Sequence, residues 1–335
     1  MRKARFCLIA IALLATACTS QWAMKTESSG TQVLWPALSE KPRVKYVQSI
    51  NGFEQTGTSV KSLIFGKAES RLLQPVTAVS GSDGRIAVSD TQAACIHLFI
   101  PSEKKYLAIT NAGSETLLSP TGLAFDEARS LYVADSALQK VFVFDRDGSY
   151  LFSFPGTAFK RPTGLAYNSA KKILYVVDTL ACKIYAVDLY GEILFSFGER
   201  GEKPGQFNFP THIFWSPSGL LYITDAMNFR VQIFDASGNF KTAFGRHGDG
   251  SGDFSMPKGV AVDKLGTIYV VDMLFDNVQL FNETGEFLLT IGSRGYGQGE
   301  FWLPNGIFVN DNKMYVSDTF NQRVQVFELL QDEYQ

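Results

Sequence analysis

One pattern recurs six times along this chain and constrains its fold more than any other feature of the sequence. Its clearest copy, Pro304 to Phe327, predicts three short strands: one after Pro-x-Gly, one that ends in Tyr-Val-Ser-Asp, and one with alternating apolar residues. In every copy a proline opens the first strand and an aspartate closes the second, 14 to 16 residues later. These pairs are Pro75 and Asp90, Pro120 and Asp135, Pro162 and Asp178, Pro210 and Asp225, Pro257 and Asp272, and Pro304 and Asp318. The constant spacing indicates one supersecondary unit repeated along the chain.

A fourth strand is expected after a turn that ends in glycine, as at Asp188 to Gly191 and Asp235 to Gly238. Aspartate caps such a turn and glycine supplies its positive φ. Each copy is then a four-stranded antiparallel meander of roughly 45 residues, the size of a propeller blade. The sixth copy lacks a fourth strand, and we expect Ser59 to Gly66, SVKSLIFG, to supply it and close the ring without a free edge. The fold class predicted is all-β, a six-bladed propeller whose last blade is closed by an N-terminal strand.

Three segments resemble NHL repeats: PKGVAVDKLGTIYVVD (Pro257 to Asp272), DAMNFRVQIF (Asp225 to Phe234) and GYGQGEFWLP (Gly295 to Pro304). This resemblance also implies a six-bladed propeller, which we place at residues 42–330. The first copy departs from the pattern, since Thr77 stands where the family has glycine and its third strand reads CIHLF.

The N-terminus has the pattern of an export signal. Basic residues precede a short apolar run and small residues that end at Ala17, which predicts a signal peptide over residues 1–17. Cys18 follows directly and resembles the lipidated cysteine of bacterial lipoproteins, although Ala15 stands where that family usually has leucine. Residues 18–41 are expected to be the lipidated N-terminus and a polar, aperiodic tether. The expected location is the cell envelope, anchored to the membrane by lipid on its periplasmic or surface side.

Charge and cysteine content restrict the partners. A formal net charge of −2 argues against nucleic acid as a ligand. Once Cys7 and Cys18 are assigned to the N-terminal signal, Cys95 and Cys182 remain, in the first and third copies at unequal repeat positions. We therefore expect two buried free thiols rather than a disulfide.

The six repeated aspartates are interpreted as structural, because a reaction needs one constellation rather than six equal copies. Asp225 with Arg230, and Asp318 with Arg323, are placed to pair across the turn that follows the second strand.

Binding is expected on one face of the propeller. In an antiparallel blade, the loops between blades and the turns between the second and third strands share a face, which we call the loop face. Its glycine-rich loops carry basic and aromatic residues typical of a recognition surface. The candidates are Arg200, His247, Arg294, Tyr296, Trp302, Phe229, Phe275 and Phe320. Phe207, Phe254 and Phe301 recur between blades and are expected in the core instead.

One residue breaks the symmetry near the axis. His212 replaces glycine in Pro-x-Gly, and Thr211, Lys258 and Asn305 occupy the neighbouring channel mouth. A zinc site there, as in the amidating lyases that resemble NHL proteins, generally needs three protein ligands, and the inner strands offer only this histidine. A calcium site, as in six-bladed lactonases, needs carboxylates that the inner strands lack. We therefore predict no cofactor, with zinc or calcium left open, and a satisfied or exposed histidine is the simpler interpretation.

The sequence thus predicts a binding scaffold whose partner is a protein, peptide or glycan of the cell envelope, held by the loop face. The alternative is a metal-dependent lyase or hydrolase, similar to the amidating lyases or the lactonases, at the channel mouth. A component of an electron-transfer or secretion assembly is a third possibility, although no Cys-x-x-Cys-His haem site is present.

Overall fold

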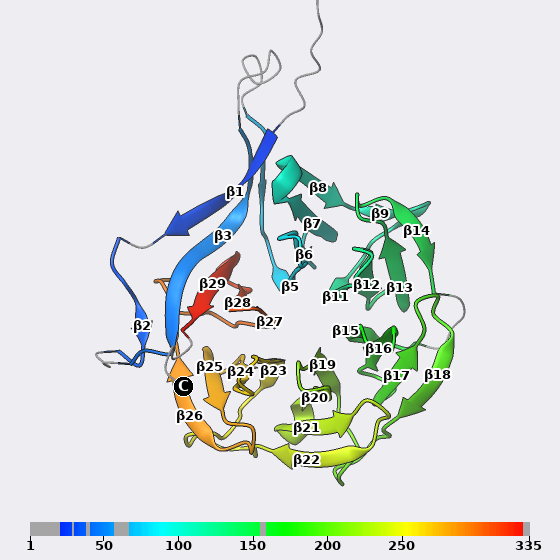
Figure 1. The fold of residues 1–335 in the computed structure, drawn as a ribbon, viewed down its shortest axis with the longest axis vertical. Coiled ribbons are helices and arrows are strands. Elements are labelled where there is room, and N and C mark those ends of the chain that lie inside the picture. The colour runs from blue at the N-terminus through cyan, green and yellow to red at the C-terminus, as the bar shows by residue number, and fades with distance from the viewer. Residues whose placement is uncertain (1–20, 29, 38–40, 57–66, 155–158, 331–335) are drawn as a thin grey trace, which may run out of the picture.

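The computed structural model describes residues 21–28, 30–37, 41–56, 67–154 and 159–330. Six β-sheets stand around a central axis like the blades of a propeller (Figure 1). Five of them are four-stranded and antiparallel, and the sixth has seven strands. This confirms the predicted all-β propeller of four-stranded antiparallel blades. No helix in the described ranges is long and apolar enough to cross a membrane.

Each predicted copy of the repeat forms one blade, with its first strand nearest the axis (Figure 1). Blade 1 contains β5 (Pro75–Ser80), β6 (Ile86–Asp90), β7 (Cys95–Ile100) and β8 (Lys105–Ile109); blade 2 contains β11 (Pro120–Phe125), β12 (Leu131–Asp135), β13 (Lys140–Phe144) and β14 (Tyr150–Ser153). Blade 3 contains β15 (Pro162–Asn168), β16 (Ile173–Asp178), β17 (Lys183–Val187) and β18 (Ile193–Phe197); blade 4 contains β19 (Pro210–Trp215), β20 (Leu220–Asp225), β21 (Arg230–Asp235) and β22 (Phe240–Phe244). Blade 5 contains β23 (Pro257–Val262), β24 (Ile268–Asp272), β25 (Asn277–Phe281) and β26 (Phe287–Ile291), and blade 6 contains β27 (Ile307–Asn310), β28 (Lys313–Asp318), β29 (Arg323–Leu329) and β3 (Val44–Thr56).

A few short elements lie outside this plan. β9 (Asn111–Ala112) and β10 (Glu115–Thr116) form a small hairpin between blades 1 and 2. Two 3-10 turns, η1 (Pro101–Glu103) and η2 (Ala226–Asn228), connect strands within blades 1 and 4.

An N-terminal strand closes the ring, as predicted, but it is a different strand from the one expected. β3 pairs antiparallel with β29, with Ile50 opposite Val324. Ser59 to Gly66, the segment we expected at this position, lies outside the described residues. β3 suits the position because its apolar residues include Val44, Ile50 and Phe53, all buried against the neighbouring blades.

The segment expected to be an aperiodic tether contains two strands instead. β1 (Gln21–Ser28) pairs along β3, and β2 (Leu34–Trp35) pairs with the start of β3; β4 (Glu69–Arg71) pairs near its end. Trp22 and Met24, two positions apart on β1, pack on the cluster around Phe53. Apolar residues at every second position are typical of a strand, even in a largely polar segment.

The unusual third strand of blade 1 lies where these N-terminal strands dock. Phe53 of β3 stacks on Tyr106 at 4.6 Å between ring centroids, and Trp22 of β1 contacts the same ring at 4.8 Å. Beneath them, His97 and Cys95 are buried, and Nδ1 of His97 lies 2.8 Å from the Tyr106 hydroxyl. Cys95 and Cys182 are both buried and free, as predicted.

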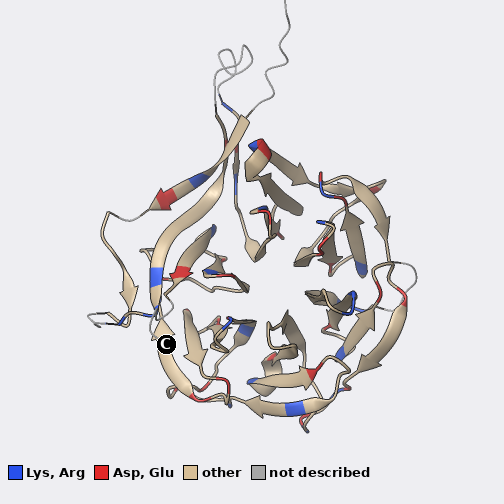
Figure 2. Cartoon of the chain, viewed as in Figure 1, with Lys and Arg blue, Asp and Glu red and all other residues tan. Residues whose placement is uncertain are grey.

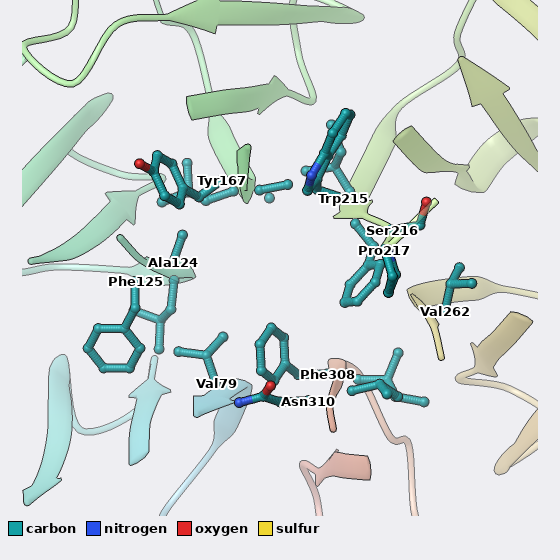
Figure 3. A pocket seen from close by; sticks show the side chains of 18 of the residues that line it. Val79, Ala124, Phe125, Tyr167, Trp215, Ser216, Pro217, Val262, Phe308 and Asn310 are labelled. Carbon is teal, nitrogen blue, oxygen red and sulfur yellow. The ribbon is translucent and has the colours of Figure 1, made fainter. Parts of the chain in front are cut away.

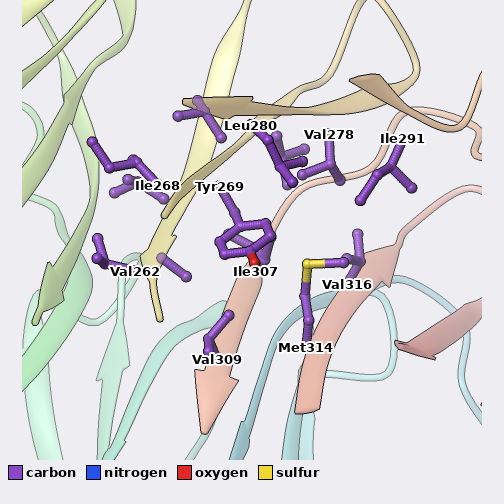
Figure 4. Packing of buried hydrophobic residues seen from close by; sticks show 14 of the residues in the cluster. Val262, Ile268, Tyr269, Val278, Leu280, Ile291, Ile307, Val309, Met314 and Val316 are labelled. Atoms are coloured by element: carbon purple, nitrogen blue, oxygen red, sulfur yellow. The ribbon is translucent and has the colours of Figure 1, made fainter. Parts of the chain in front are cut away.

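The core consists of apolar strand faces packed between adjacent blades. Figure 4 shows this packing between blades 5 and 6, where Val262, Tyr269 and Leu280 meet Ile307 and Met314. Phe207, Phe254 and Phe301 are fully buried, as expected for core residues.

Glycine in Pro-x-Gly allows the inner strands to approach one another closely. A Cβ atom added to Gly122 would lie 2.0 Å from the carbonyl oxygen of Thr163, and one added to Gly306 would lie 2.3 Å from that of Val76. Most other side chains would force these neighbouring strands apart. This ring of close backbone contacts divides the axial region into two ends with different chemistry.

Candidate functional site

The loop-face end of the channel is organised by the six repeated aspartates. All six are buried, and each accepts hydrogen bonds from backbone N–H groups of the segment that leads into its own blade. Asp178, for example, accepts from the N–H of Lys160 at 2.6 Å and of Arg161 at 3.0 Å. The carboxylates therefore hold the inter-blade loops in place, which is what a structural role requires.

Two of these aspartates also form the ion pairs that were predicted from their spacing in the sequence. Nε of Arg230 donates to Asp225 at 2.8 Å, and Nε of Arg323 donates to Asp318 at 2.7 Å. Burial nevertheless raises the pKa of both carboxyl groups above the ordinary value, against the lowering effect of their hydrogen-bond donors. In blade 1, burial acts in the same direction on Asp90, but hydrogen bonds from His97 and three backbone N–H groups leave its pKa below the ordinary value.

Hydroxyl groups next to the aspartates connect neighbouring blades at this end. Ser136 and Thr179 each donate to the carbonyl of the proline that opens the next blade, both at 2.7 Å. Thr319 does the same across the closure of the ring, reaching the Pro75 carbonyl at 2.8 Å. In blades 4 and 5 this position is held by Ala226 and Met273, which have no hydroxyl.

The other end of the channel is hollow. A cavity of about 590 Å³ opens on the face that carries the turns between first and second strands, which we call the turn face. All six inner strands contribute to its wall, and Figure 3 shows aromatic side chains around it. Its aromatic residues are Phe125, Tyr167, Phe214, Trp215 and Phe308.

Packing behind the wall fixes these rings. Trp215 stacks on the buried ring of Tyr175 at 6.0 Å between centroids, and the Tyr175 hydroxyl donates to the Ala236 carbonyl at 2.8 Å. Phe308 meets Phe214 edge to face at 6.1 Å. Trp215 is only partly buried and lines the cavity (Figure 3). The cavity therefore presents a preformed aromatic platform.

The polar groups of the wall are mostly uncharged. The Asn310 amide donates to the carbonyl of Ser80 at 3.3 Å and to its hydroxyl at 3.1 Å, which leaves the Asn310 oxygen as an acceptor. The hydroxyls of Ser216 and Ser218 lie 2.8 Å apart at the mouth. The charged residues of the lining lie in the turns. Asp263 is buried and accepts hydrogen bonds from its own turn and from the Tyr269 hydroxyl, and Lys264 and Asp311 form an exposed ion pair at 2.8 Å.

His212 is the one predicted binding residue that lines this cavity, at its inner end. The substitution of glycine changes the local ladder: His212 pairs directly with Thr224, whereas in blades 2, 3 and 5 the pairing skips the glycine. Burial lowers the pKa of His212 to about 4, against the effect of a backbone hydrogen bond at Ile307, so the imidazole is neutral at pH 7. Within the described ranges, no three His, Cys, Asp or Glu side chains are grouped so as to hold a metal ion, so a metal-dependent reaction here would need ligands from elsewhere.

The other three channel-mouth residues lie one position nearer the loop face and do not line the cavity. Thr211, Lys258 and Asn305 each follow the opening proline of their strand and are half-buried. Burial lowers the pKa of Lys258, and the positive charge of Arg161 lowers it further.

The predicted loop-face residues form separate groups rather than one surface. Trp302 contacts Tyr296 at 5.4 Å and Phe320 at 5.6 Å, and the Arg294 guanidinium lies 5.9 Å from the Trp302 ring. Tyr296 and Phe320 also line a polar groove of about 450 Å³ beside β1 and β4.

The remaining predicted residues lie on other blades. Phe229 contacts His247 at 4.4 Å between ring centroids. Arg200 lies 4.9 Å from the ring of Phe209, and Phe275 is half-buried apart from these groups.

Sequence analysis missed the aromatic cavity although its signal was present. Three inner strands, TGLAF, TGLAY and THIFW, end in an aromatic residue at the same repeat position: Phe125, Tyr167 and Trp215.

Comparison with known proteins supports the fold. A family model described as a 6-bladed beta-propeller matches residues 212–274 and 265–335. No curated protein is significantly similar to this chain in sequence.

Several solved structures share the fold. They include a catalytically inactive virginiamycin B lyase from Staphylococcus aureus with quinupristin (12% identity, TM-score 0.60, covering 92% of this chain and 100% of that one). A streptogramin B lyase has 12% identity and a TM-score of 0.59 over 77% of this chain and 94% of its own. An auxiliary nutrient binding protein from Bacteroides thetaiotaomicron has 14% identity and a TM-score of 0.59 over 76% of this chain and 69% of its own. At these identities the similarity shows the fold alone.

Proposed function

We propose that this propeller is a binding protein that takes an uncharged ligand with an apolar ring face into the turn-face cavity. The observation that carries the proposal is the aromatic lining of the cavity (Figure 3), in which Trp215 is held in place by stacking on Tyr175. The site thus differs from the loop-face surface that the sequence favours.

The size and rigidity of the cavity fit this role. Its volume of about 590 Å³ lies within the range of roughly 300 to 1,000 Å³ that is usual for small-molecule sites. Rings held by their own packing lose little conformational freedom when a ligand binds, so more of the contact energy becomes affinity.

The charge distribution favours a neutral ligand. His212 is neutral at pH 7, and the charged residues of the lining lie in the turns at the rim. A charged ligand deep in the cavity would lose its hydration without gaining a counter-ion, whereas Asn310, Ser216 and Ser218 offer neutral hydrogen-bonding groups.

The named neighbours are compatible with small-ligand binding but do not carry the proposal. One contains quinupristin and another is called a nutrient binding protein. The alternative from the sequence, a metal-dependent lyase or hydrolase near His212, lacks a supporting ligand set among the described residues.

We also propose that the protein is exported and held in the cell envelope by a lipid on Cys18, which lies outside the described residues. Loss of membrane attachment in Cys18→Ala, measured by fractionation of cells, tests this part separately. Under this proposal, protein, peptide or glycan partners on the loop face are a second mode of binding, supported by the exposed cluster of Tyr296, Trp302 and Phe320.

The binding proposal is tested with N-phenyl-1-naphthylamine, a neutral aromatic probe that fluoresces strongly in apolar surroundings. We expect saturable binding of one probe molecule and a roughly tenfold weaker affinity in Trp215→Ala, corresponding to about 1.4 kcal/mol. Trp302→Ala is the matched control, because it removes the same side chain from the loop face. Neutral oligosaccharides and short apolar peptides are then compared as competitors of the bound probe.

Two results would overturn the proposal. Unchanged probe binding in Trp215→Ala would remove the cavity from consideration. Loss of binding in Trp302→Ala with an intact fold would move the site to the loop face.

A further inference from the structure

The loop-face end of the channel holds polar side chains with unused hydrogen-bonding capacity on three consecutive inner strands. Thr211 on β19, Lys258 on β23 and Asn305, just before β27, occupy the same repeat position. The backbones are adjacent here, since the N–H of Gly259 donates to the Asn305 carbonyl at 3.0 Å. We infer that these residues, with Arg161, form a binding site for a small oxyanion, a carboxylate or phosphate, separate from the turn-face cavity.

Comparison with blades 2 and 3 shows that these groups are unusual. At the same repeat position there, the Thr121 hydroxyl lies 3.0 Å from that of Ser136, and the Thr163 hydroxyl lies 2.8 Å from that of Thr179. In blade 4 the corresponding partner is Ala226, and the buried Thr211 hydroxyl has no hydrogen-bond partner. The repeat therefore has a way to satisfy this position, and blade 4 lacks it.

Lys258 is the strongest element of the site. The residue is half-buried, and its ammonium group forms no ion pair or hydrogen bond with any described residue. An ammonium group that loses water without gaining acceptors is destabilised, and an anion would supply both charge and acceptors. The lowered pKa of Lys258 agrees with this environment.

Arg161 provides a second cation at this end. It directly precedes Pro162, its side chain is exposed, and its charge acts on Lys258. Two cations that repel each other bind an anion placed between them favourably. Arg161 suits a carboxylate or phosphate because its planar guanidinium can donate two parallel hydrogen bonds.

The carboxylates of the neighbouring blades are bonded to groups other than Lys258. The repeated aspartates of blades 3, 4 and 5 accept hydrogen bonds from backbone N–H groups, and Asp225 also pairs with Arg230. The inner strands themselves carry no Asp or Glu, and most of the ribbon around the axis is uncharged (Figure 2). None of these aspartates pairs with Lys258.

The test uses inorganic phosphate and acetate, titrated calorimetrically into the propeller at constant ionic strength. We expect one phosphate to bind and Lys258→Met to weaken it by about tenfold or more. Lys264→Met is the matched control, because it removes an equivalent charge at the turn-face rim and should change the affinity less than about twofold. Acetate that competes with phosphate would indicate a carboxylate ligand, and acetate that does not bind would indicate phosphate.

The outcome is independent of the aromatic cavity. Lys258→Met should keep full affinity for N-phenyl-1-naphthylamine, and Trp215→Ala should keep full affinity for phosphate. Without phosphate, Lys258→Met should be at least as stable as the parent protein, because it removes a desolvated and unpaired charge. Absence of phosphate binding, or equal binding by Lys258→Met, overturns the inference.

Discussion

The two ends of the central channel are formed by the same six strands and have opposite character. At the loop-face end, side chains are polar, buried and bonded to the backbone of the segments between blades, as Asp178 and Thr179 are. At the turn-face end, the strands separate around a cavity lined by apolar and aromatic side chains such as Trp215. Interactions that hold the blades in place are concentrated at one end, and the space for a ligand lies at the other.

The difference appears in how much each repeat position varies between blades. The residue that closes the second strand is aspartate in all six copies, because each carboxylate binds the loop into its blade. The residue five positions after the opening proline bonds to no such loop and differs widely. It is Ser80, Phe125, Tyr167, Trp215, Val262 and Val309 in blades 1 to 6. Positions that the assembly of blades does not need are free to specify a ligand.

The largest difference in stability between the two ends is expected when a buried aspartate is removed from each. Asp318→Ala at the loop-face end leaves Arg323 buried without its partner and should lower the free energy of unfolding by about 3 to 5 kcal/mol. Asp263→Ala is the turn-face counterpart: this carboxylate accepts 2.9 Å hydrogen bonds from the N–H of Leu265 and of Thr267 and from the Tyr269 hydroxyl. Its removal should cost about 1 to 2 kcal/mol, as measured by urea unfolding. Equal losses would show that the loop-face end does not carry more of the stability.

The fold was predictable because its information is repeated. A fixed spacing from proline to aspartate and period-two apolar patterns defined five blades and three strands of the sixth. The closing strand was misplaced because it occurs once. Ser59 to Gly66 ends like a fourth strand, whereas the pairing of β3 with β29 depends on the burial of residues such as Ile50 and Phe53.

The candidate site was predictable only in part. His212 was found because it breaks the symmetry of Pro-x-Gly. The aromatic cavity depends on six separate strand ends meeting around one axis, and on Tyr175 of blade 3 supporting Trp215 of blade 4. A sequence shows an aromatic residue at a strand end, but not whether its ring faces a cavity or a neighbouring blade.

A second prediction concerns the close approach of backbones between the two ends. Gly122→Ala would place a methyl group 2.0 Å from the Thr163 carbonyl oxygen, whereas the nearest atom to the same change at Gly164 is the Cα of His212 at 3.1 Å. We expect Gly122→Ala to destabilise the propeller by about 3 kcal/mol and Gly164→Ala by about 1 kcal/mol, because the methyl group overlaps neighbouring backbone much more deeply at Gly122. Denaturant midpoints of the two variants measure the difference. Similar midpoints would mean that the inner strands relax easily and that the two ends are not rigidly divided.

The smallest expected effect is a pH dependence at the floor of the cavity. The pKa of His212 is about 4 in the folded protein, below its unfolded value near 6.5. Between these values the unfolded chain binds more protons, so the contribution of His212 lowers the stability progressively as the pH falls from about 6.5 to about 4.

We expect this contribution to reach about 2 kcal/mol at pH 4, reduced by water that reaches the half-buried ring. It is measured as the difference in unfolding free energy between His212→Gln and the parent protein at several pH values, which cancels the titration of the carboxylates. His247→Gln, on the exposed loop face, controls for the loss of a histidine side chain as such. If the difference in unfolding free energy between His212→Gln and the parent protein does not change with pH, the imidazole is hydrated in both the folded and the unfolded state. The cavity floor would then be accessible to water rather than apolar.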